Sequence, residues 1–411
     1  MSAGRRVRPT GGTAHEDAPA ALVAATQHLE PPFAVVDLDA FDRNADALVE
    51  RAGGSPIRVA SKSVRCRFLT ARVLRRPGFS GVLAFSLEEA LWLVTGTDTL
   101  PADHDVLVAY PSVDRAAFER LAGNAEARRR IVVMADGDAH LDLAESVMRA
   151  GSVPDGQRLR VCLDVDASYR IGRLHLGARR SPLRTEADVA PLVHRLVASD
   201  VLEPAGLMFY DAQIAGVADS SRLVRQVQRR SAAELAGRRR RIVEAAIEIA
   251  GIGLLVNAGG TGSLHLMGPD PSVTEVAAGS GLFAPHLFDD YRAFDLEPAA
   301  FFVTPVVRRP APGYVTVFGA GLVASGAAGA SRLPRPWWPR GLRLVGTEGA
   351  GEVQTPLRVP AGVHLEVGDR VWFRHAKAGE LCERVDRLHL VTGGAVADVV
   401  PTYRGEGRCF G

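Results

Sequence analysis

Lys62 is the residue whose type and position in the sequence most clearly suit chemistry. It follows residues 57–61, a short apolar run that predicts a buried strand. A lysine at the carboxyl end of a buried strand stands where α/β proteins place their chemistry, and burial lowers the pKa of an ammonium toward that of a usable amine. Such an amine can bond covalently to an aldehyde cofactor. Taken alone, an exposed loop lysine is the simpler interpretation, so the other strand ends must decide.

Polar side chains also follow later strands of the same pattern. Arg170 comes after the fifth predicted strand, and Tyr210 ends the sixth. Two turns rich in glycine and hydroxyl residues follow the seventh and eighth strands, and they contain Gly260, Thr261, Gly262, Ser263, Gly279, Ser280 and Gly281. Glycine lets backbone N–H groups approach an anion, and hydroxyls add further donors. A lysine for an aldehyde, an arginine and two phosphate-binding turns together suit pyridoxal 5′-phosphate.

The elements that must position these residues alternate in type along the chain. Between residue 57 and about residue 283, eight short apolar runs alternate with stretches that carry apolar residues at three- and four-residue spacing. Eight strand–helix units are the number that closes a (β/α)8 barrel, whose active site lies at the carboxyl ends of its strands. An open doubly wound sheet is the alternative. After about residue 298, short strands separated by Gly and Pro predict an all-β region.

We therefore predict an α/β fold, in which a TIM-type (β/α)8 barrel is followed by a smaller all-β C-terminal domain. The barrel is expected at 31–297 and the β domain at 298–411, with residues 31–40 as a segment that can pair with the β domain. Residues 1–30 are expected to be a disordered tail. The basic run at 238–241 lies in a helical stretch, and we expect it to form a solvated helix face.

Composition and charge exclude several classes of protein. A formal net charge of +2 gives no reason to expect nucleic acid as a partner. No apolar run is long enough to predict a transmembrane helix, so no membrane partner is expected. The four cysteines form no CxxC pair, which argues against a disulfide framework and favours reduced thiols. We expect a cytoplasmic protein.

The order of the motifs resembles one enzyme family. The segments that carry the resemblance are PFAVVDLDAFDRN at 32–44, RVASK at 58–62, GLMFY at 206–210 and GGTGS at 259–263. They resemble the fold type III pyridoxal phosphate enzymes, the group of the alanine racemase N-terminal domain. Within that group the chain is most similar to the D-threonine aldolase and D-serine dehydratase branch, and to bacterial proteins described as amino-acid deaminase/aldolase. The similarity spans residues 32 to about 395.

The resemblance implies a role for each candidate residue. Lys62 would hold pyridoxal phosphate as an internal aldimine and then act as a base at Cα. Arg170 would face the pyridine nitrogen, with Arg173 as its rival, and Tyr210 would contact the substrate or the cofactor. The resemblance also implies a homodimer in which the β domain of one subunit covers the barrel mouth of the other.

The segment at 374–383 bears on the type of reaction, and here the chain departs from the family pattern. The aldolase and dehydratase relatives bind a divalent metal, such as Zn or Mn, through a histidine and a Cys or Asp two residues later. That metal would polarise the β-hydroxyl of the substrate. This chain has His375 but Lys377 at the second position. Two interpretations stay open: Cys382 joins His375 as a metal ligand, or the Lys377 ammonium, oriented by Glu380, replaces the metal.

The residues and the resemblance together predict a pyridoxal phosphate-dependent lyase, either a deaminase/dehydratase or an aldolase. Its substrate would be a small D-β-hydroxy amino acid such as D-serine or D-threonine. The first alternative is an amino-acid racemase, which needs a second base, typically a tyrosine from the β domain of a partner subunit; the candidates are Tyr291, Tyr314 and Tyr403. The second is a non-catalytic pyridoxal phosphate-binding protein, but those relatives consist of the barrel alone.

Overall fold

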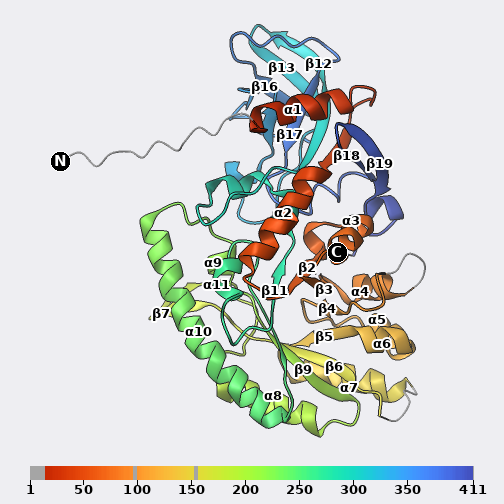
Figure 1. Ribbon diagram of the computed structural model, residues 1–411, viewed down its shortest axis with the longest axis vertical. Helices are drawn as coiled ribbons and strands as arrows, with labels where there is room; N and C mark the ends of the chain where they lie inside the picture. Colours follow the sequence, from red (N-terminus) through yellow and green to blue (C-terminus); the bar gives the residue numbers. More distant parts are fainter. Residues whose placement is uncertain (1–13, 96–99, 152–155, 411) are drawn as a thin grey trace, which may run out of the picture.

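The chain builds a closed parallel barrel and a separate, mostly antiparallel sheet, which lie one above the other along the long axis of the molecule (Figure 1). The computed structural model describes residues 14–95, 100–151 and 156–410. The barrel has eight strands, in the order β10, β11, β2, β3, β4, β5, β6 and β9. The predicted TIM-type barrel with a C-terminal β domain is therefore confirmed, and the open sheet is not.

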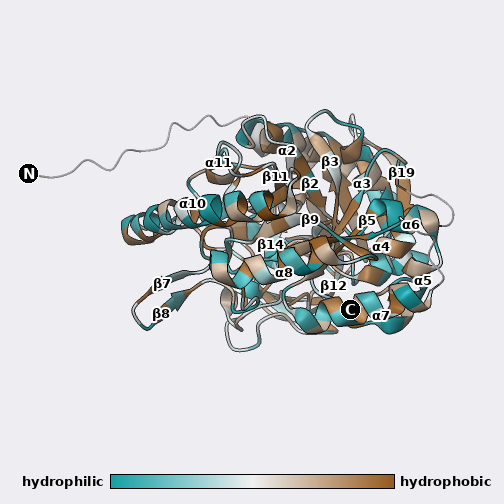
Figure 2. Cartoon of the chain, turned by 90° about the horizontal axis from the view of Figure 1, so that it is seen from below, coloured by the Kyte–Doolittle hydropathy of each residue, from teal (hydrophilic) through white to brown (hydrophobic). Residues whose placement is uncertain are grey.

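The barrel strands are short and mostly buried. Their bounds are β2 (Ile57–Ala60), β3 (Phe79–Ala84), β4 (Val106–Val108), β5 (Ile131–Ala135), β6 (Leu159–Asp164), β9 (Leu202–Phe209), β10 (Leu255–Ala258) and β11 (Glu275–Ala278). The surrounding helices are α2 (Leu38–Arg51), α3 (Arg67–Leu74), α4 (Leu87–Val94), α5 (Arg115–Ala122), α6 (Ala125–Arg130), α7 (Asp138–Ala150), α8 (Glu186–Ala198) and α10 (Arg222–Ala250). Short helices follow the last strands: α9 (Ala212–Ala215), α11 (Leu264–Met267) and α12 (Ser280–Phe283). Figure 2 shows apolar strands inside a ring of helices whose outer faces are hydrophilic.

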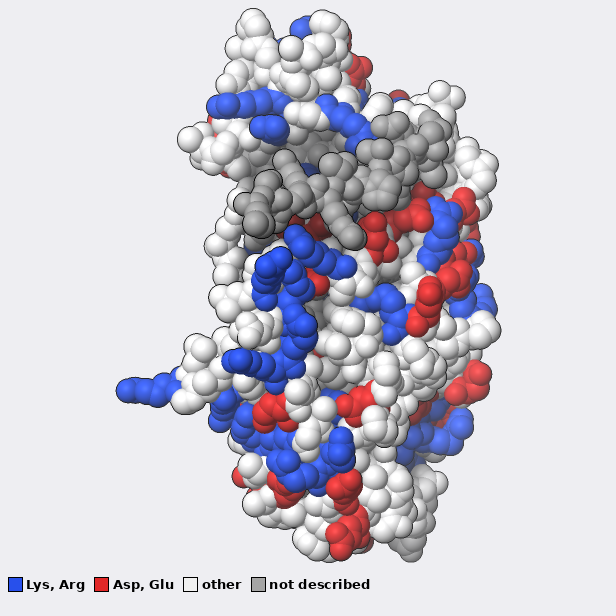
Figure 3. Space-filling model, turned by 60° about the vertical axis from the view of Figure 1, so that its left-hand side comes forward, with Lys and Arg blue, Asp and Glu red and all other residues white. Residues whose placement is uncertain are grey.

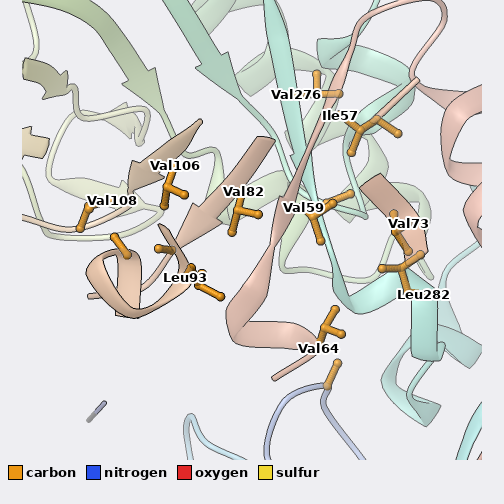
Figure 4. Close-up of a cluster of buried hydrophobic side chains, with 14 of the residues drawn as sticks. Ile57, Val59, Val64, Val73, Val82, Leu93, Val106, Val108, Val276 and Leu282 are labelled. Carbon is orange, nitrogen blue, oxygen red and sulfur yellow. The ribbon is translucent and has the colours of Figure 1, made fainter. Parts of the chain in front are cut away.

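Alternating side chains of each strand fill two different cores. Val59, Val82 and Val106 point outward toward the helices, where Leu93 of α4 and Leu282 of α12 belong to the same buried cluster (Figure 4). Each of these side chains is fully buried, which stabilises the fold by about 1.5–3 kcal/mol per residue. The residues between them face the barrel interior, where the buried cluster consists of Leu107, Val132, Met134, Cys162 and Met208.

A buried ion pair occupies the barrel interior below that apolar layer. Arg58 of β2 donates two hydrogen bonds to Glu275 of β11, at 2.6 and 2.8 Å, and a third to Asp105 at 2.7 Å. Asn257 of β10 donates to the same glutamate at 2.7 Å. The pair therefore ties the first, seventh and eighth strands of the barrel, whose carboxyl ends carry Lys62 and the two glycine-rich turns.

The β domain is built on a nine-stranded sheet that includes a strand from before the barrel. Its strands are β1 (Phe33–Asp37), β12 (Ala300–Ala311), β13 (Tyr314–Phe318), β14 (Arg335–Trp338), β15 (Arg343–Leu344), β16 (Gln354–Arg358), β17 (Arg370–Arg374), β18 (Arg387–Thr392) and β19 (Ala395–Pro401). β1 pairs antiparallel with β12 and parallel with β18. Since α2 follows β1 directly, the chain passes from this sheet into the barrel (Figure 1).

Part of the predicted tail lies outside the described residues, and its later part contains helix α1 (Ala14–Ala25). None of the described helices is long and apolar enough to cross a membrane. On the face of the molecule in Figure 3, acidic and basic side chains are interspersed, and Lys and Arg side chains gather in its middle.

The prediction that the basic run at 238–241 forms a solvated helix face is wrong for two of its arginines. Arg238 and Arg239 of α10 are buried. Arg239 pairs with Asp270 at 2.7 Å, and Arg238 donates to the backbone oxygens of Asp166 and Ser168 at 2.6 and 3.1 Å. Because a guanidinium carries several donors in one plane, α10 can hold the loop after β6 in place. That loop leads to the arginines near the barrel mouth.

Candidate active site

A cavity of about 470 Å³ lies at the carboxyl ends of the barrel strands, a size suited to a small ligand. The barrel contributes Lys62, Tyr110, Arg180 and Tyr210 to its lining, together with the glycine-rich turns. The β domain contributes residues from two segments, around 332 and around 377. The cavity is thus enclosed by both domains, and it brings together most of the residues predicted from the sequence.

Lys62 follows β2 in a single 3-10 turn (Ser61–Ser63), and its side chain is exposed to the cavity rather than buried as the sequence suggested. Its Nζ donates a hydrogen bond to Tyr110 Oη at 3.3 Å. The backbone around it is fixed by the β domain: Gly379 has a φ of 101°, and a Cβ there would collide with the carbonyl oxygen of Lys62. Glycine is therefore required at 379 for the two domains to meet behind the lysine.

Tyr110 is a site residue that the sequence reasoning missed. It follows β4, and its hydroxyl accepts the hydrogen bond from Lys62. Burial raises the pKa of this phenol, but the positive charges of Lys62 and Arg180 outweigh burial, and its pKa lies below the ordinary value of 10.0. The strand-end rule that selects Lys62 also selects Tyr110, so the signal was present in the sequence.

Arg170 does not reach the cavity. It lies in a two-stranded hairpin, β7 (Tyr169–Ile171) and β8 (Leu174–Leu176), where its exposed guanidinium donates to Asp166 at 2.6 Å. Arg173, its rival, is exposed at the turn of the same hairpin. The hairpin carries both side chains away from the barrel, and the chain returns to the cavity only at Arg180.

Arg180 lies close to two of the tyrosines that line the cavity. Its guanidinium carbon lies 5.3 Å from the ring centroid of Tyr110 and 5.4 Å from that of Tyr210. Both distances allow cation–π attraction. Close by, burial and the neighbouring Asp136 raise the pKa of Asp164 to about 7, against the opposing effect of Arg180.

The two glycine-rich turns lie side by side, and Gly279 and Gly281 have no room for a side chain. Gly260, Thr261, Gly279 and Ser280 line the cavity. Thr261 Oγ1 accepts hydrogen bonds from the N–H of Gly281 at 3.1 Å and from Ser280 Oγ at 3.2 Å, so one hydroxyl joins both turns. A Cβ on Gly279 would collide with the carbonyl oxygen of Ala60, and one on Gly281 would lie 2.8 Å from side-chain carbons.

Gly262 and Ser263 shape the first turn from behind. A Cβ on Gly262 would collide with the carbonyl oxygen of Ala215. Ser263 is fully buried, and its Oγ accepts a hydrogen bond from the N–H of Gly260 at 3.2 Å. These two residues therefore hold the turn in shape and do not line the cavity themselves.

The candidate metal ligands His375 and Cys382 do not come together at the cavity. His375 is buried against the ring of Phe283, and burial, followed by the charge of Arg374, lowers its pKa to about 3. Cys382 belongs to the apolar core, where burial and the nearby Cys66 raise its pKa. Among the described residues no group of three His, Cys, Asp or Glu side chains could hold a metal ion. The described donor set therefore does not fit the divalent metal.

Lys377, in contrast, lines the cavity. Its Nζ donates to Ser325 Oγ at 3.0 Å, and Glu380 accepts a hydrogen bond from the N–H of Ser325 at 2.9 Å. Glu380 thus orients the lysine through Ser325 and not by direct contact. Burial lowers the pKa of Lys377; the charges of Lys62 and Arg332 lower it further, while Glu380 opposes them.

The charged residues of the cavity are mostly cationic and unpaired. Lys62, Arg180, Arg332 and Lys377 line it, and Asp290 is its one carboxylate. Within the described chain, none of these four cations forms an ion pair with a carboxylate. The positive potential that these four cations create in the cavity favours an anionic ligand.

The lysines are themselves a signal that the motif analysis overlooked. The sequence contains only two lysines, Lys62 and Lys377, and every other basic side chain among its 49 Lys and Arg residues is arginine. Both lysines line the same cavity. A lysine can lose its proton and react as an amine, whereas an arginine stays charged in proteins. The chain therefore places its only side-chain amines where an amine can do chemistry.

Comparison with known proteins supports the fold. No family model matches the chain, and no curated protein is similar to it in sequence. Solved structures do match. A D-threonine aldolase from Filomicrobium marinum is 22% identical with a TM-score of 0.76, over 92% of this chain and 96% of that chain. The D-threo-3-hydroxyaspartate dehydratase from Delftia sp. HT23 is 20% identical with a TM-score of 0.65, over 91% and 97%.

An alanine racemase from Clostridium difficile 630, in complex with cycloserine, is more distant: it is 13% identical with a TM-score of 0.61, over 91% of this chain and 99% of that chain. All three structures match the barrel and the β domain together, since the matches cover nine-tenths of the chain. The resemblance drawn from the motifs is thus confirmed at the level of the fold.

Proposed function

We propose that this protein is a pyridoxal phosphate-dependent lyase that acts on a small D-β-hydroxy amino acid. The observation that carries the proposal is the position of Lys62, which shares a cavity of unpaired cations with two glycine-rich turns. Solved structures of a D-threonine aldolase and a D-threo-3-hydroxyaspartate dehydratase, which have the same fold, support it.

The residues of the cavity fit this cofactor. Gly260, Thr261, Gly279 and Ser280 would hold the phosphate, because their turns bring backbone and hydroxyl groups to the cavity and the glycines keep it free of larger side chains. Lys62 would hold the aldehyde carbon. When bound, pyridoxal phosphate supplies an electrophile for the substrate amine and a ring that withdraws electrons from Cα.

The residues around Lys62 would set the protonation of the site. In a dehydration, Lys62 Nζ would take the proton from the substrate Cα, and Tyr110 Oη, which accepts a hydrogen bond from Lys62 at 3.3 Å, would hold the amine in place. Arg180, in place of Arg170, would face the ring of the cofactor from beside Tyr110 and Tyr210. An arginine keeps its proton, so it can donate a hydrogen bond to a ring nitrogen but cannot protonate it.

Lys377 would act at the β-hydroxyl. Burial and the charges of Lys62 and Arg332 lower its pKa, which makes the neutral amine more accessible than in a free lysine. As a base it would take the hydroxyl proton when the Cα–Cβ bond breaks in an aldol cleavage. As an acid it would protonate the departing hydroxide in a dehydration. In either case the ammonium interpretation is favoured over a metal on His375 and Cys382.

The alternatives have less support. A racemase needs a second base. Tyr291 is poorly suited to this role, because its hydroxyl donates a hydrogen bond to the backbone oxygen of Ala215 at 3.1 Å and burial raises its pKa. Tyr403 is buried against Glu89, away from the cavity. A non-catalytic binding protein would have no need of β-domain cations in the cavity. The homodimer and the cytoplasmic location stay predictions; a solution mass of twice 43.8 kDa would support the dimer.

The two-lysine composition gives a direct test. Incubation with pyridoxal phosphate should produce an absorbance band near ~420 nm. Borohydride reduction followed by peptide mass spectrometry should then find the cofactor on Lys62. In Lys62→Ala the band should be absent, and in the control Lys377→Met it should persist. A label on Lys377 alone would contradict the proposal. Assays of D-serine and D-threonine for keto acid and for aldehyde would then separate dehydratase from aldolase.

A further inference from the structure

Arg332 is a further cavity residue that no sequence motif identified. It lies in the loop between β13 and β14 and lines the cavity from the β-domain side, as Lys377 does. The glycine-rich turns line the same cavity from the barrel. Arg332 and Lys377 thus face the same cavity from the same domain.

The guanidinium of Arg332 has no partner in the part of the chain that the structure describes. It forms no ion pair or side-chain hydrogen bond there, and its Nε atom is buried and unsatisfied. Neighbouring arginines behave differently, since Arg335 and Arg374 both pair with Asp289, each with a contact of 2.8 Å. A buried donor without a partner costs about 1–3 kcal/mol, so a ligand that supplies an acceptor would be bound favourably.

The loop is built to hold Arg332 in this place. The N–H of Arg332 donates to Gly329 O at 2.9 Å, and its carbonyl oxygen accepts from the N–H of Ala324 at 2.8 Å. The next residue, Leu333, is tied to the barrel because its carbonyl oxygen bonds His286 Nε2 at 2.8 Å.

The absence of a side chain at Gly326 leaves space for the guanidinium of Arg332. Gly326 has a φ of 119°, and a Cβ there would lie 3.2 Å from Arg332 Nε. The guanidinium therefore lies against bare backbone. A side chain at 326 would strain the backbone and push the arginine out of its position.

We propose that Arg332 binds the carboxylate of the amino-acid substrate, and that Gly326 positions the arginine for it. This rests on the proposed function. A planar guanidinium matches a carboxylate with two parallel hydrogen bonds. The substrate is then held at three points: its amine at the barrel side by the cofactor, its carboxylate by Arg332, and its β-hydroxyl by Lys377. Three fixed groups define the configuration at Cα.

The test compares kinetics of Arg332→Gln and Arg332→Lys with the wild type on the preferred D-β-hydroxy amino acid. In Arg332→Gln, KM is expected to rise about 10- to 100-fold, the loss of a charge-assisted hydrogen-bonded pair. Arg332→Lys keeps the positive charge, so its KM should lie between those of the wild type and Arg332→Gln. The amino alcohol that lacks only the carboxylate should inhibit the wild type and Arg332→Gln equally. Arg335→Gln, which removes a paired arginine three residues away, is the control and should leave KM unchanged.

A second pair of variants tests the positioning. Gly326→Ala should raise KM in the direction of Arg332→Gln, whereas Gly329→Ala, where a Cβ meets nothing within 4 Å, should not. All variants should bind pyridoxal phosphate with the wild-type absorbance band. An unchanged KM in Arg332→Gln, or loss of the band in that variant alone, would overturn the role of Arg332. Absence of the band in the wild type would instead overturn the proposed function.

Discussion

Glu89 is a fully buried carboxyl directly behind the lysine-bearing strand end, and its replacement by glutamine should change how stability depends on pH. Its Oε2 accepts a hydrogen bond from the N–H of Phe85 at 2.7 Å, and its Oε1 accepts one from Tyr403 Oη at 2.9 Å. Burial raises its pKa from 4.5 to about 7, although these hydrogen bonds oppose the shift. Glu89 thus joins the first barrel strands to the C-terminal segment.

The sign and size of the effect follow from this pKa. A carboxyl with a raised pKa binds its proton more tightly in the folded state, so its contribution to stability is full below pH 4.5 and is lost as pH rises through about 7. A shift of about 2.5 units corresponds to about 3 kcal/mol at 1.36 kcal/mol per unit. Glutamine cannot ionise. Glu89→Gln should therefore gain stability relative to the wild type by up to about 3 kcal/mol between pH 4.5 and pH 8.

Urea unfolding at a series of pH values measures this difference. Burial also raises the pKa of Asp164 and Asp211 to about 7 each, but both remain in the variant, so their effects cancel in the comparison. Glu88→Gln is the matched control, because Glu88 lies beside Glu89 on α4 and forms a half-exposed ion pair with Arg120. If Glu89→Gln and the wild type lose stability in parallel as pH rises, then Glu89 is not a buried acid with a raised pKa and the reasoning is refuted.

Three further predictions concern the barrel and the site. Arg58→Leu leaves a carboxylate buried without its partner and should destabilise the protein by about 3–5 kcal/mol in urea unfolding; an effect below 1 kcal/mol would show that the pair is dispensable. Gly279→Ala places a methyl group against Ala60 O and should weaken binding of pyridoxal phosphate in a spectrophotometric titration, whereas Gly137→Ala, with open space around it, should not. Chelators should leave turnover intact while Lys377→Met abolishes it, and a chelator-sensitive enzyme would contradict the role given to Lys377.

Much of the fold and half of the site could be predicted because they depend on local pattern. Short apolar runs alternating with helical periodicity identify a barrel, and the barrel fixes the end at which its strands present side chains. Lys62, Tyr210 and the two glycine-rich turns all follow strands directly, so their meeting at one cavity requires nothing beyond the closure of the sheet.

The residues that the sequence misplaced depend on how irregular segments fold. Arg170 and Arg180 are both arginines after the fifth strand of the barrel, and only the hairpin between them decides which one returns to the cavity. Arg332 lies in a loop without periodicity. His375 follows β17 of the β domain, and its burial against Phe283 depends on the packing of that domain onto the barrel. Contacts of this kind, between segments far apart in the chain, cannot be predicted from local sequence patterns.

The division of the cavity between two domains suggests how its chemistry is organised. The barrel holds every group assigned to the cofactor, whereas both cations assigned to the substrate lie on the β domain. The two cations are connected through one loop. Ser325 of this loop accepts a hydrogen bond from Lys377, and the N–H of Ser325 donates to Glu380. The same loop continues to Arg332. Both cations therefore lie on one connected part of the β domain, which meets the backbone of Lys62 at Gly379. Under the proposed function, this part of the β domain would determine the reaction, with Lys377 as the amine that transfers the proton at the β-hydroxyl.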